Sequence, residues 1–121
     1  MNSYIELDVW IESRNLVKLI YEVCSLFPPE EKFGISSQMK RSAISIPSNI
    51  AEGCGRQTAK DTVHFLHIAK GSLFELETQV YLANDLGFVQ NKEKEDLLIQ
   101  ITSCKKLLNG FINYYRKKNG N

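Results

Sequence analysis

The sequence predicts an all-α protein, an antiparallel up-down-up-down four-helix bundle. Its 121 residues fit one domain, and a hydrophobic fraction of 43% is enough to build a core. Apolar residues recur at helical spacing in successive segments, and no segment alternates as a strand would. Amphipathic helices on short loops pack beside their sequence neighbours. We therefore expect one domain over residues 1–121, with helices at roughly 8–27, 36–54, 59–86 and 91–117.

The first helix is indicated by an apolar stripe with steps of three, four and seven residues. Asp8 is its candidate N-cap. The helix should stop before the Pro28–Pro29 pair, because a residue that precedes a proline is disfavoured in helical conformation. The stripe consists of Val9, Leu16, Ile20, Val23 and Phe27.

The second helix has Ser36 or Ser37 as its candidate cap and ends at the glycines Gly53 and Gly55. Pro47 lies inside the pattern, where it removes a backbone donor, and predicts a kink rather than a break. The stripe consists of Ile35, Met39, Ala43, Ile46 and Ile50.

The third helix has the most regular stripe in the chain. Thr58 is its candidate N-cap, with Asp61 three residues later in the manner of a capping box. Gly87 is the stop signal. The stripe alternates steps of four and three through Thr62, Leu66, Ala69, Leu73, Leu76, Val80 and Ala83.

The fourth helix begins at the candidate cap Asn91, with acidic residues in its first turns and basic residues in its last. This order suits the helix dipole at both ends. Its stripe consists of Leu97, Ile101, Cys104, Leu108, Phe111 and Tyr115.

The third helix carries more apolar surface than one bundle can cover. A stripe is sufficient to pack a helix, yet further apolar residues extend around most of its circumference. Gly71 is costly in mid-helix, and close approach of another backbone would offset that cost. Scattered exposed apolar residues are the alternative explanation. We predict a homo-oligomer whose candidate interface residues are Phe65, Ile68, Phe74 and Tyr81.

The three cysteines, Cys24, Cys54 and Cys104, are odd in number and lack the Cys-x-x-Cys spacing of a metal site. We expect buried free thiols. The first residues show neither a basic start nor an apolar run, and no apolar stretch is long enough to cross a membrane. These features predict a soluble, cytoplasmic protein without membrane contact.

Catalysis and metal binding find little support in the sequence. Asp61, His64 and His67 are spaced like a carboxylate-x-x-His motif, but a di-metal bundle needs this motif on two helices. Structural roles are therefore favoured for all three. Neither a nucleophile elbow nor a phosphate-binding loop is present. We expect no enzyme activity, no catalytic residues, no cofactor and no metal.

Two long stretches, residues 33–57 and 65–87, carry a family resemblance together with LDVWIESRNLVKLIYEV at 7–23. The runs SIPSNIAEG at 45–53 and GSLFELET at 71–78 are its most specific parts. The chain resembles the family of 23S ribosomal RNA intervening-sequence proteins over nearly its whole length. The resemblance implies a four-helix bundle that assembles into pentameric rings. It also relates the chain to an accessory protein of diversity-generating retroelements, which is thought to bind nucleic acid through a strongly basic surface.

Charge is segregated along the chain, although the net charge is only +1. Residues 1–35 carry −3, 36–71 carry +3, 72–99 carry −4 and 100–121 carry +5. In an up-down bundle the turn between the second and third helices lies at the same end as the C-terminus. That end is predicted to be basic, although acidic residues there reduce its field, and the other end acidic. The candidate phosphate contacts are Lys40, Arg41, Arg56, Lys60, Arg116, Lys117 and Lys118.

A second set of polar residues lies within the stretches that carry the resemblance: Asn49, Glu52, Glu75 and Glu77. We hypothesise that one of these glutamates pairs with Arg41 or Arg56 across the second and third helices or across a subunit boundary. Such a pair fixes helix register more than it adds stability. The alternative is a small-ligand pocket.

Together these features predict a non-enzymatic, homo-oligomeric helical bundle that acts as a binding or scaffold module, with RNA or DNA as the first partner to test. The alternative is a self-assembling protein-protein interaction module with no role in nucleic-acid binding. The third hypothesis is that the protein binds a small ligand or is an enzyme.

Overall fold

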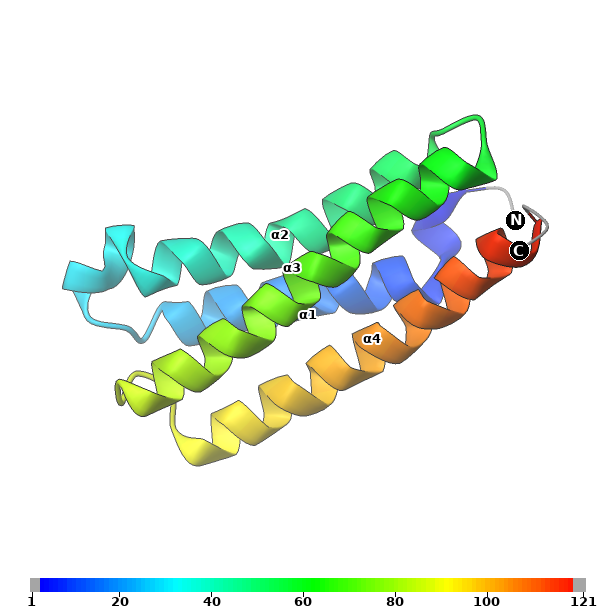
Figure 1. Ribbon diagram of the computed structural model, residues 1–121. Coiled ribbons are helices and arrows are strands. Elements are labelled where there is room, and N and C mark those ends of the chain that lie inside the picture. The colour runs from blue at the N-terminus through cyan, green and yellow to red at the C-terminus, as the bar shows by residue number, and fades with distance from the viewer. Residues whose placement is uncertain (1–2, 119–121) are drawn as a thin grey trace.

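The prediction of an all-α, four-helix protein is confirmed by a computed structural model, which describes residues 3–118. The helices are α1 (Asp8–Cys24), α2 (Ile35–Cys54), α3 (Ala59–Asp85) and α4 (Asn91–Lys118), and two 3-10 helices, η1 (Tyr4–Glu6) and η2 (Pro29–Phe33), precede α1 and α2. No strand occurs among the described residues. Figure 1 shows each helix running back along the one before it, with the α2–α3 turn at the same end as both chain termini.

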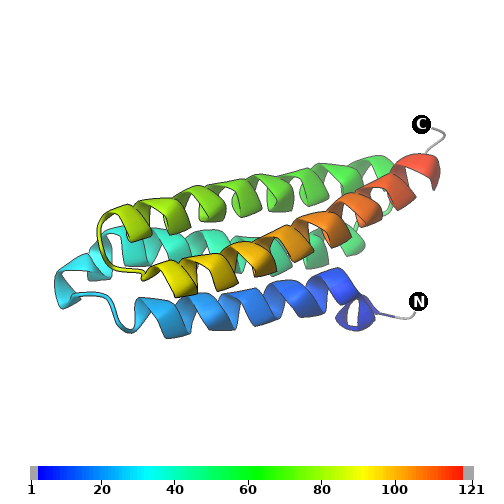
Figure 2. The ribbon, with the colours of Figure 1, turned by 90° about the horizontal axis from the view of Figure 1, so that it is seen from below.

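The helices form a square in which sequence neighbours pack together and α4 closes back on α1. Figure 2 shows this arrangement from below, with α1 and α4 side by side. Diagonal helices make no close backbone approach within residues 3–118. The core is one cluster of buried side chains from all four helices, joined by Phe27 and Val89 from the connections at the end away from the termini.

The stripe of α3 is buried along its full predicted length, from Thr62 to Ala83. In α4 the last part of the stripe differs from the prediction. Ile112 is buried, whereas Phe111 and Tyr115 pack at the edge of the core. A step of four from Leu108 to Ile112 keeps the side chain on the core side, whereas the step of three to Phe111 rotates it away.

The helix ends correct two predicted caps. Helix α1 begins at Asp8 itself, and α2 begins at Ile35, so neither Asp8 nor Ser36 accepts a capping hydrogen bond. Asp8 instead places its carboxylate in the first turn, where it suits the helix dipole. The predicted cap of α3 is confirmed, since the Thr58 hydroxyl accepts from the backbone N–H of Asp61 at 3.1 Å.

Two further boundaries differ from or extend the prediction. Helix α1 ends at Cys24 rather than at Phe27, because the residues before Pro28 leave the helical path one turn earlier than the apolar pattern indicates. At the start of α4 the Glu93 carboxylate accepts from the backbone N–H of Gln90 at 2.9 Å. Helix α2 runs unbroken through Pro47.

Candidate nucleic-acid interface

The structure divides the predicted basic residues between two places. Lys40 and Arg41 lie in the first half of α2, whereas Arg56 lies two residues beyond its last residue, Cys54. At 1.5 Å per residue, Lys40 and Arg56 are separated by about 24 Å along the helix axis. Arg56 and Lys60 flank the α2–α3 turn, at the end of the bundle where α4 finishes (Figure 1). One continuous basic patch is therefore excluded.

We call Arg56, Lys60, Arg116, Lys117 and Lys118 the terminal basic end. Two of its cations are already engaged. The Arg56 guanidinium lies 2.9 Å from the Glu52 carboxylate, and it stacks on the ring of Phe65 at 4.4 Å. Arg116 Nη2 lies 2.8 Å from Nε2 of His67. This end therefore has fewer free cations than the sequence indicates.

His67 reports the local field at the terminal basic end. Its pKa is lowered from the ordinary value, first by desolvation and then by the nearby charges of Arg116, Lys70 and His64. Cations that disfavour a further proton would favour an anion at the same place.

The other basic place is a groove of about 460 Å³ beside the α1–α2 connection. We call it the basic groove, and it is lined by Tyr21, Lys32, Phe33, Ser37, Lys40, Arg41 and Ile44. It combines cations and aromatic rings from α1, η2 and α2. In the part of the chain that the structure describes, no carboxylate lies within 4.0 Å of the charged nitrogens of Lys32, Lys40 or Arg41.

Five lining residues of the basic groove were not predicted as site residues: Tyr21, Lys32, Phe33, Ser37 and Ile44. Lys32 and Phe33 join Lys40 and Arg41 because η2 folds back against α2, and Tyr21 joins them because α1 packs beside α2. A short 3-10 helix has no apolar period to identify it. The available signal was the isolated Lys32–Phe33 pair in a loop otherwise occupied by prolines and glutamates. This groove also places cations near an end predicted to be acidic.

The predicted polar cluster does not form one site. Glu52 does pair with Arg56, but locally at the C-terminal end of α2 rather than across helices. Glu77 bonds Lys105 of α4 at 2.8 Å, with both side chains largely shielded, and Glu75 is exposed. The hypothesis that Glu77 pairs with Arg41 or Arg56 across α2 and α3 is therefore wrong, and a pair across a subunit boundary stays a prediction.

Asn49, the remaining member of that cluster, belongs to the packing of α2 against α3. Its amide donates to the carbonyl and hydroxyl oxygens of Ser45, at 2.9 and 3.0 Å. Ser45 in turn contacts the hydroxyl of Ser72 at 2.8 Å. The Asn49 amide therefore donates its hydrogen bonds within α2, to the serine that contacts α3, and does not line a pocket.

The predicted interface residues are only partly available. Ile68, Phe74 and Tyr81 have exposed fractions of 40%, 49% and 48%, whereas Phe65 is half-buried beneath Arg56. Lysines of α4 cover one face of two of these rings, with Lys105 4.2 Å from the centroid of Phe74.

A hollow of about 460 Å³ opens on the outer face of α3, beside Gly71, Phe74 and Leu82. A Cβ atom on Gly71 would meet nothing within 4 Å. Oε1 of Gln79, at the edge of the hollow, is buried and has no hydrogen-bond partner among the described residues. No contact within residues 3–118 accounts for the open glycine or for the unpaired amide oxygen.

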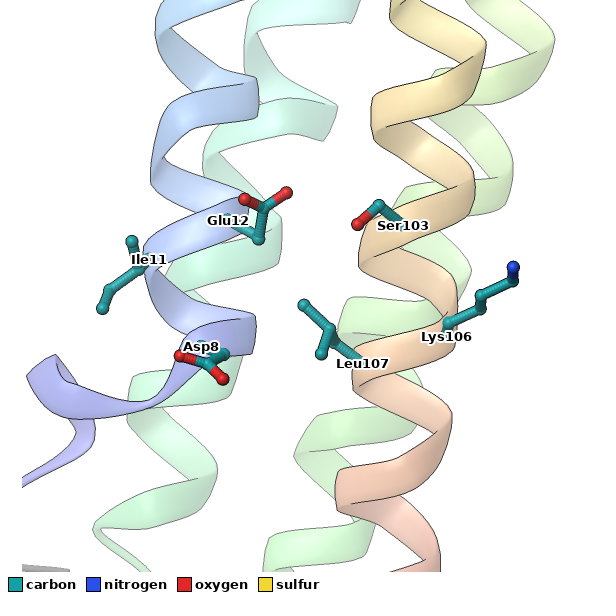
Figure 3. A pocket seen from close by; sticks show the side chains of 6 residues that line it. All are labelled: Asp8, Ile11, Glu12, Ser103, Lys106 and Leu107. Atoms are coloured by element: carbon teal, nitrogen blue, oxygen red, sulfur yellow. The ribbon is translucent and has the colours of Figure 1, made fainter.

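A third surface feature is a cleft of about 410 Å³ between α1 and α4 (Figure 3). Glu12 and Ser103 point toward one another across it, and Lys106 extends away from α1. Glu12 accepts a hydrogen bond from the Gln100 amide at 2.6 Å. Asp8 completes its polar lining, so the cleft contains both charge signs and selects neither.

The free thiols of Cys24, Cys54 and Cys104 are poor nucleophiles. Burial raises the pKa of each, and the Glu12 carboxylate adds to the effect at Cys104, whose pKa is about 12. A thiol is reactive as its thiolate, which a raised pKa suppresses. Cys54 is half-buried rather than buried, in contrast to the prediction.

Within residues 3–118 no group of three or more His, Cys, Asp or Glu side chains is arranged to hold a metal ion. None of the helices found there is both long and apolar enough to span a bilayer.

The fold and its surfaces define a small all-α bundle with two basic surfaces. Residues 5–110 match the family model described as 23S rRNA-intervening sequence protein, and the chain belongs to that family. It is similar to the 1.70 Å crystal structure of a protein of unknown function from the S23 ribosomal protein family of Bacteroides thetaiotaomicron VPI-5482. The two are 27% identical with a TM-score of 0.79, over 86% of this chain and 97% of that one. None of the curated proteins matches the sequence.

Proposed function

We propose that this protein is a non-enzymatic, self-associating bundle of the cytoplasm that binds nucleic acid through its basic groove. The observation that carries the proposal is the convergence of Lys32, Lys40 and Arg41 in one groove, where none of them has a carboxylate partner among residues 3–118. Such cations can contact phosphates, and each phosphate contact releases counterions. The free thiols suit a reducing compartment.

Self-association supports the proposal of nucleic-acid binding, because a weakly binding groove that is repeated in each subunit of a ring gains avidity. The outer face of α3 supports it. That face presents exposed apolar side chains, an open Gly71 and an unsatisfied amide oxygen on Gln79. A second copy would cover the apolar side chains and could donate to the amide oxygen. A pentamer is the assembly that the family resemblance implies.

Nucleic-acid binding is tested by salt titration with RNA and duplex DNA. We expect retention at low salt and weakening as salt rises. The variant Lys40→Gln/Arg41→Gln should reduce the slope of log K against log salt by about 0.7–0.9 for each phosphate that is no longer neutralised. The matched control, Lys92→Gln/Lys106→Gln, removes the same charge from exposed positions of α4 and should leave the slope unchanged. No retention by the natural sequence at low salt would reject the proposal.

The assembly is tested by light scattering on two glycine variants. Gly71 and Gly110 both lie within helices, and a Cβ on either meets nothing within 4 Å. We expect Gly71→Leu to reduce the assembly mass, because it blocks the outer face of α3, and Gly110→Leu to preserve it. Equal masses for both variants and the natural protein would place the contact elsewhere.

The alternative function is a protein-protein interaction module with no role in nucleic-acid binding. The unsatisfied Gln79 oxygen in an apolar hollow is the observation that favours it. Intact assembly without nucleic-acid retention would support this alternative.

A further inference from the structure

We propose that the basic groove takes single-stranded nucleic acid, with bases stacked on Phe33 and Tyr21 and phosphates bound by Lys32, Lys40 and Arg41. This inference rests on the proposed function and specifies its ligand. The aromatic rings of the groove point to contacts with bases, because a surface that binds only phosphates does not need them.

Phe33 has an exposed fraction of 88%, the highest of the large apolar side chains in residues 3–118. A phenylalanine left in water forfeits the free energy that burial of its ring would contribute. Phe33 stands at the end of η2, outside the hydrophobic core. Its ring is therefore free to stack on a ligand.

Each ring has a cation of its own. Lys32 Nζ lies 5.6 Å from the centroid of Phe33, and Lys40 Nζ lies 4.9 Å from the centroid of Tyr21. The groove thus repeats a unit of one ring and one ammonium group. A nucleic-acid strand repeats the complementary unit, because each of its nucleotides carries one base and one phosphate. Arg41 adds a third cation in the same groove.

The rings discriminate between single strands and duplexes. In a duplex the base faces are stacked on one another, and the backbone presents phosphates. In a single strand the base faces are accessible, and stacking on aromatic side chains combines with a basic groove in proteins that bind such strands. A duplex would use the three cations and leave Phe33 and Tyr21 in water.

The terminal basic end offers a weaker version of the same arrangement. Lys118 Nζ lies 5.1 Å from the ring centroid of Tyr114, whose exposed fraction is 49%. Its other cations include Arg56 and Arg116, which are already engaged by Glu52 and His67. The basic groove is therefore the site that we assign.

The test measures the affinity of two proteins for each of two strands by fluorescence anisotropy at low salt. The proteins are the natural chain and Phe33→Leu, which keeps an apolar side chain and removes the ring. The strands are labelled oligothymidine and an abasic strand of the same length, which keeps the phosphates and lacks the bases. We expect Phe33→Leu to weaken oligothymidine binding by about tenfold and to leave abasic-strand binding unchanged.

Control variants separate stacking from other effects. Leu26→Ser removes another exposed apolar side chain, of 73% exposed fraction, and should leave both affinities unchanged. Tyr21→Leu should act like Phe33→Leu. If Tyr114→Leu weakens oligothymidine binding while Phe33→Leu does not, the ligand binds at the terminal basic end and our assignment is wrong.

The outcomes also distinguish this inference from the proposed function. If neither strand binds, and RNA and duplex DNA are not retained at low salt either, the proposed function and the inference both fail. If both strands bind equally, and Lys40→Gln/Arg41→Gln weakens both while Phe33→Leu weakens neither, the groove binds phosphates and the single-strand inference alone is overturned. A preference for duplex DNA over oligothymidine would overturn it as well.

Discussion

The two seams that α2–α3 and α1–α4 form are built in opposite ways. Between α2 and α3, small residues allow close approach, and hydroxyl groups bond directly across the seam. Between α1 and α4, the hydrogen bond comes from the long side chains of Glu12 and Gln100, beside an open cleft. A Cβ atom added at Gly53 in the first seam would lie 3.1 Å from the backbone of α3, whereas the second seam leaves a cleft of about 410 Å³. Only the first should be sensitive to the size of a single side chain.

Gly53 shows how tight the α2–α3 seam is. A Cβ there would lie 3.1 Å from the carbonyl oxygen of Thr62 and 3.3 Å from the Cβ of Phe65. The Thr62 hydroxyl donates to the Gly53 carbonyl at 2.7 Å. The run SIPSNIAEG ends at this glycine, and its first residue, Ser45, bonds Ser72 across the same seam. This part of the resemblance therefore identifies a packing arrangement more directly than a binding site.

The largest expected effect comes from widening a side chain in the tight seam. We expect Gly53→Val to lower the free energy of unfolding by about 1–3 kcal/mol, because the added carbons overlap the backbone of α3. Gly110→Val is the matched control, since its Cβ meets nothing within 4 Å. Urea denaturation at matched protein concentration measures both. If the two variants are equally stable, α2 and α3 can move apart at Gly53 at a lower cost in free energy than the close distances there indicate.

A smaller effect is expected from removing one hydrogen bond of that seam without changing its shape. Thr62→Val keeps the side-chain volume and deletes the donor to the Gly53 carbonyl, which still accepts from the backbone N–H of Arg56. We expect a loss of about 1 kcal/mol. Thermal unfolding by circular dichroism measures it, with the exposed Ser48→Ala as the control. A loss as large as that of Gly53→Val would show that hydrogen bonding, rather than packing, dominates the seam.

Helical periodicity predicts the fold well because burial imposes it along every turn. The α3 stripe could be read residue by residue, since all its members face the core. Prediction was weaker at helix starts, where Asp8 and Ser36 fit a cap by residue type. The start is decided by where the preceding chain enters the helix, and residue type alone does not reveal this path.

The candidate site was predicted less completely than the fold. Lys40 and Arg41 could be selected by charge, but their neighbours Tyr21 and Phe33 come from other elements. Glu52 was a candidate to pair with Arg56 across helices, yet a spacing of four residues at the end of α2 brings the two together locally. A sequence gives the period of each helix directly, whereas contacts between a 3-10 helix and its neighbours depend on the loop path.

The smallest stability effect is expected at the α1–α4 seam, from Glu12→Gln. This change preserves the side-chain shape and removes a charge beside an open cleft, so the free energy of unfolding should change by about 0.5 kcal/mol. Urea denaturation alongside Gly53→Val measures it. A loss equal to that of Gly53→Val would remove the contrast between the seams.

Glu12→Gln should also change the titration of Cys104. The native pKa of this thiol is about 12 against an ordinary 9.0, because burial and, secondarily, the Glu12 charge disfavour the thiolate. Between these values the unfolded chain releases a proton that the native protein keeps, so stability falls as the pH rises. Removing the charge lowers the native pKa slightly and weakens this pH dependence. Iodoacetamide labelling followed peptide by peptide should modify half-buried Cys54 before Cys104 in both proteins. Faster labelling of Cys104 than of Cys54 in Glu12→Gln would mean that the Glu12 charge, rather than burial, protects the thiol.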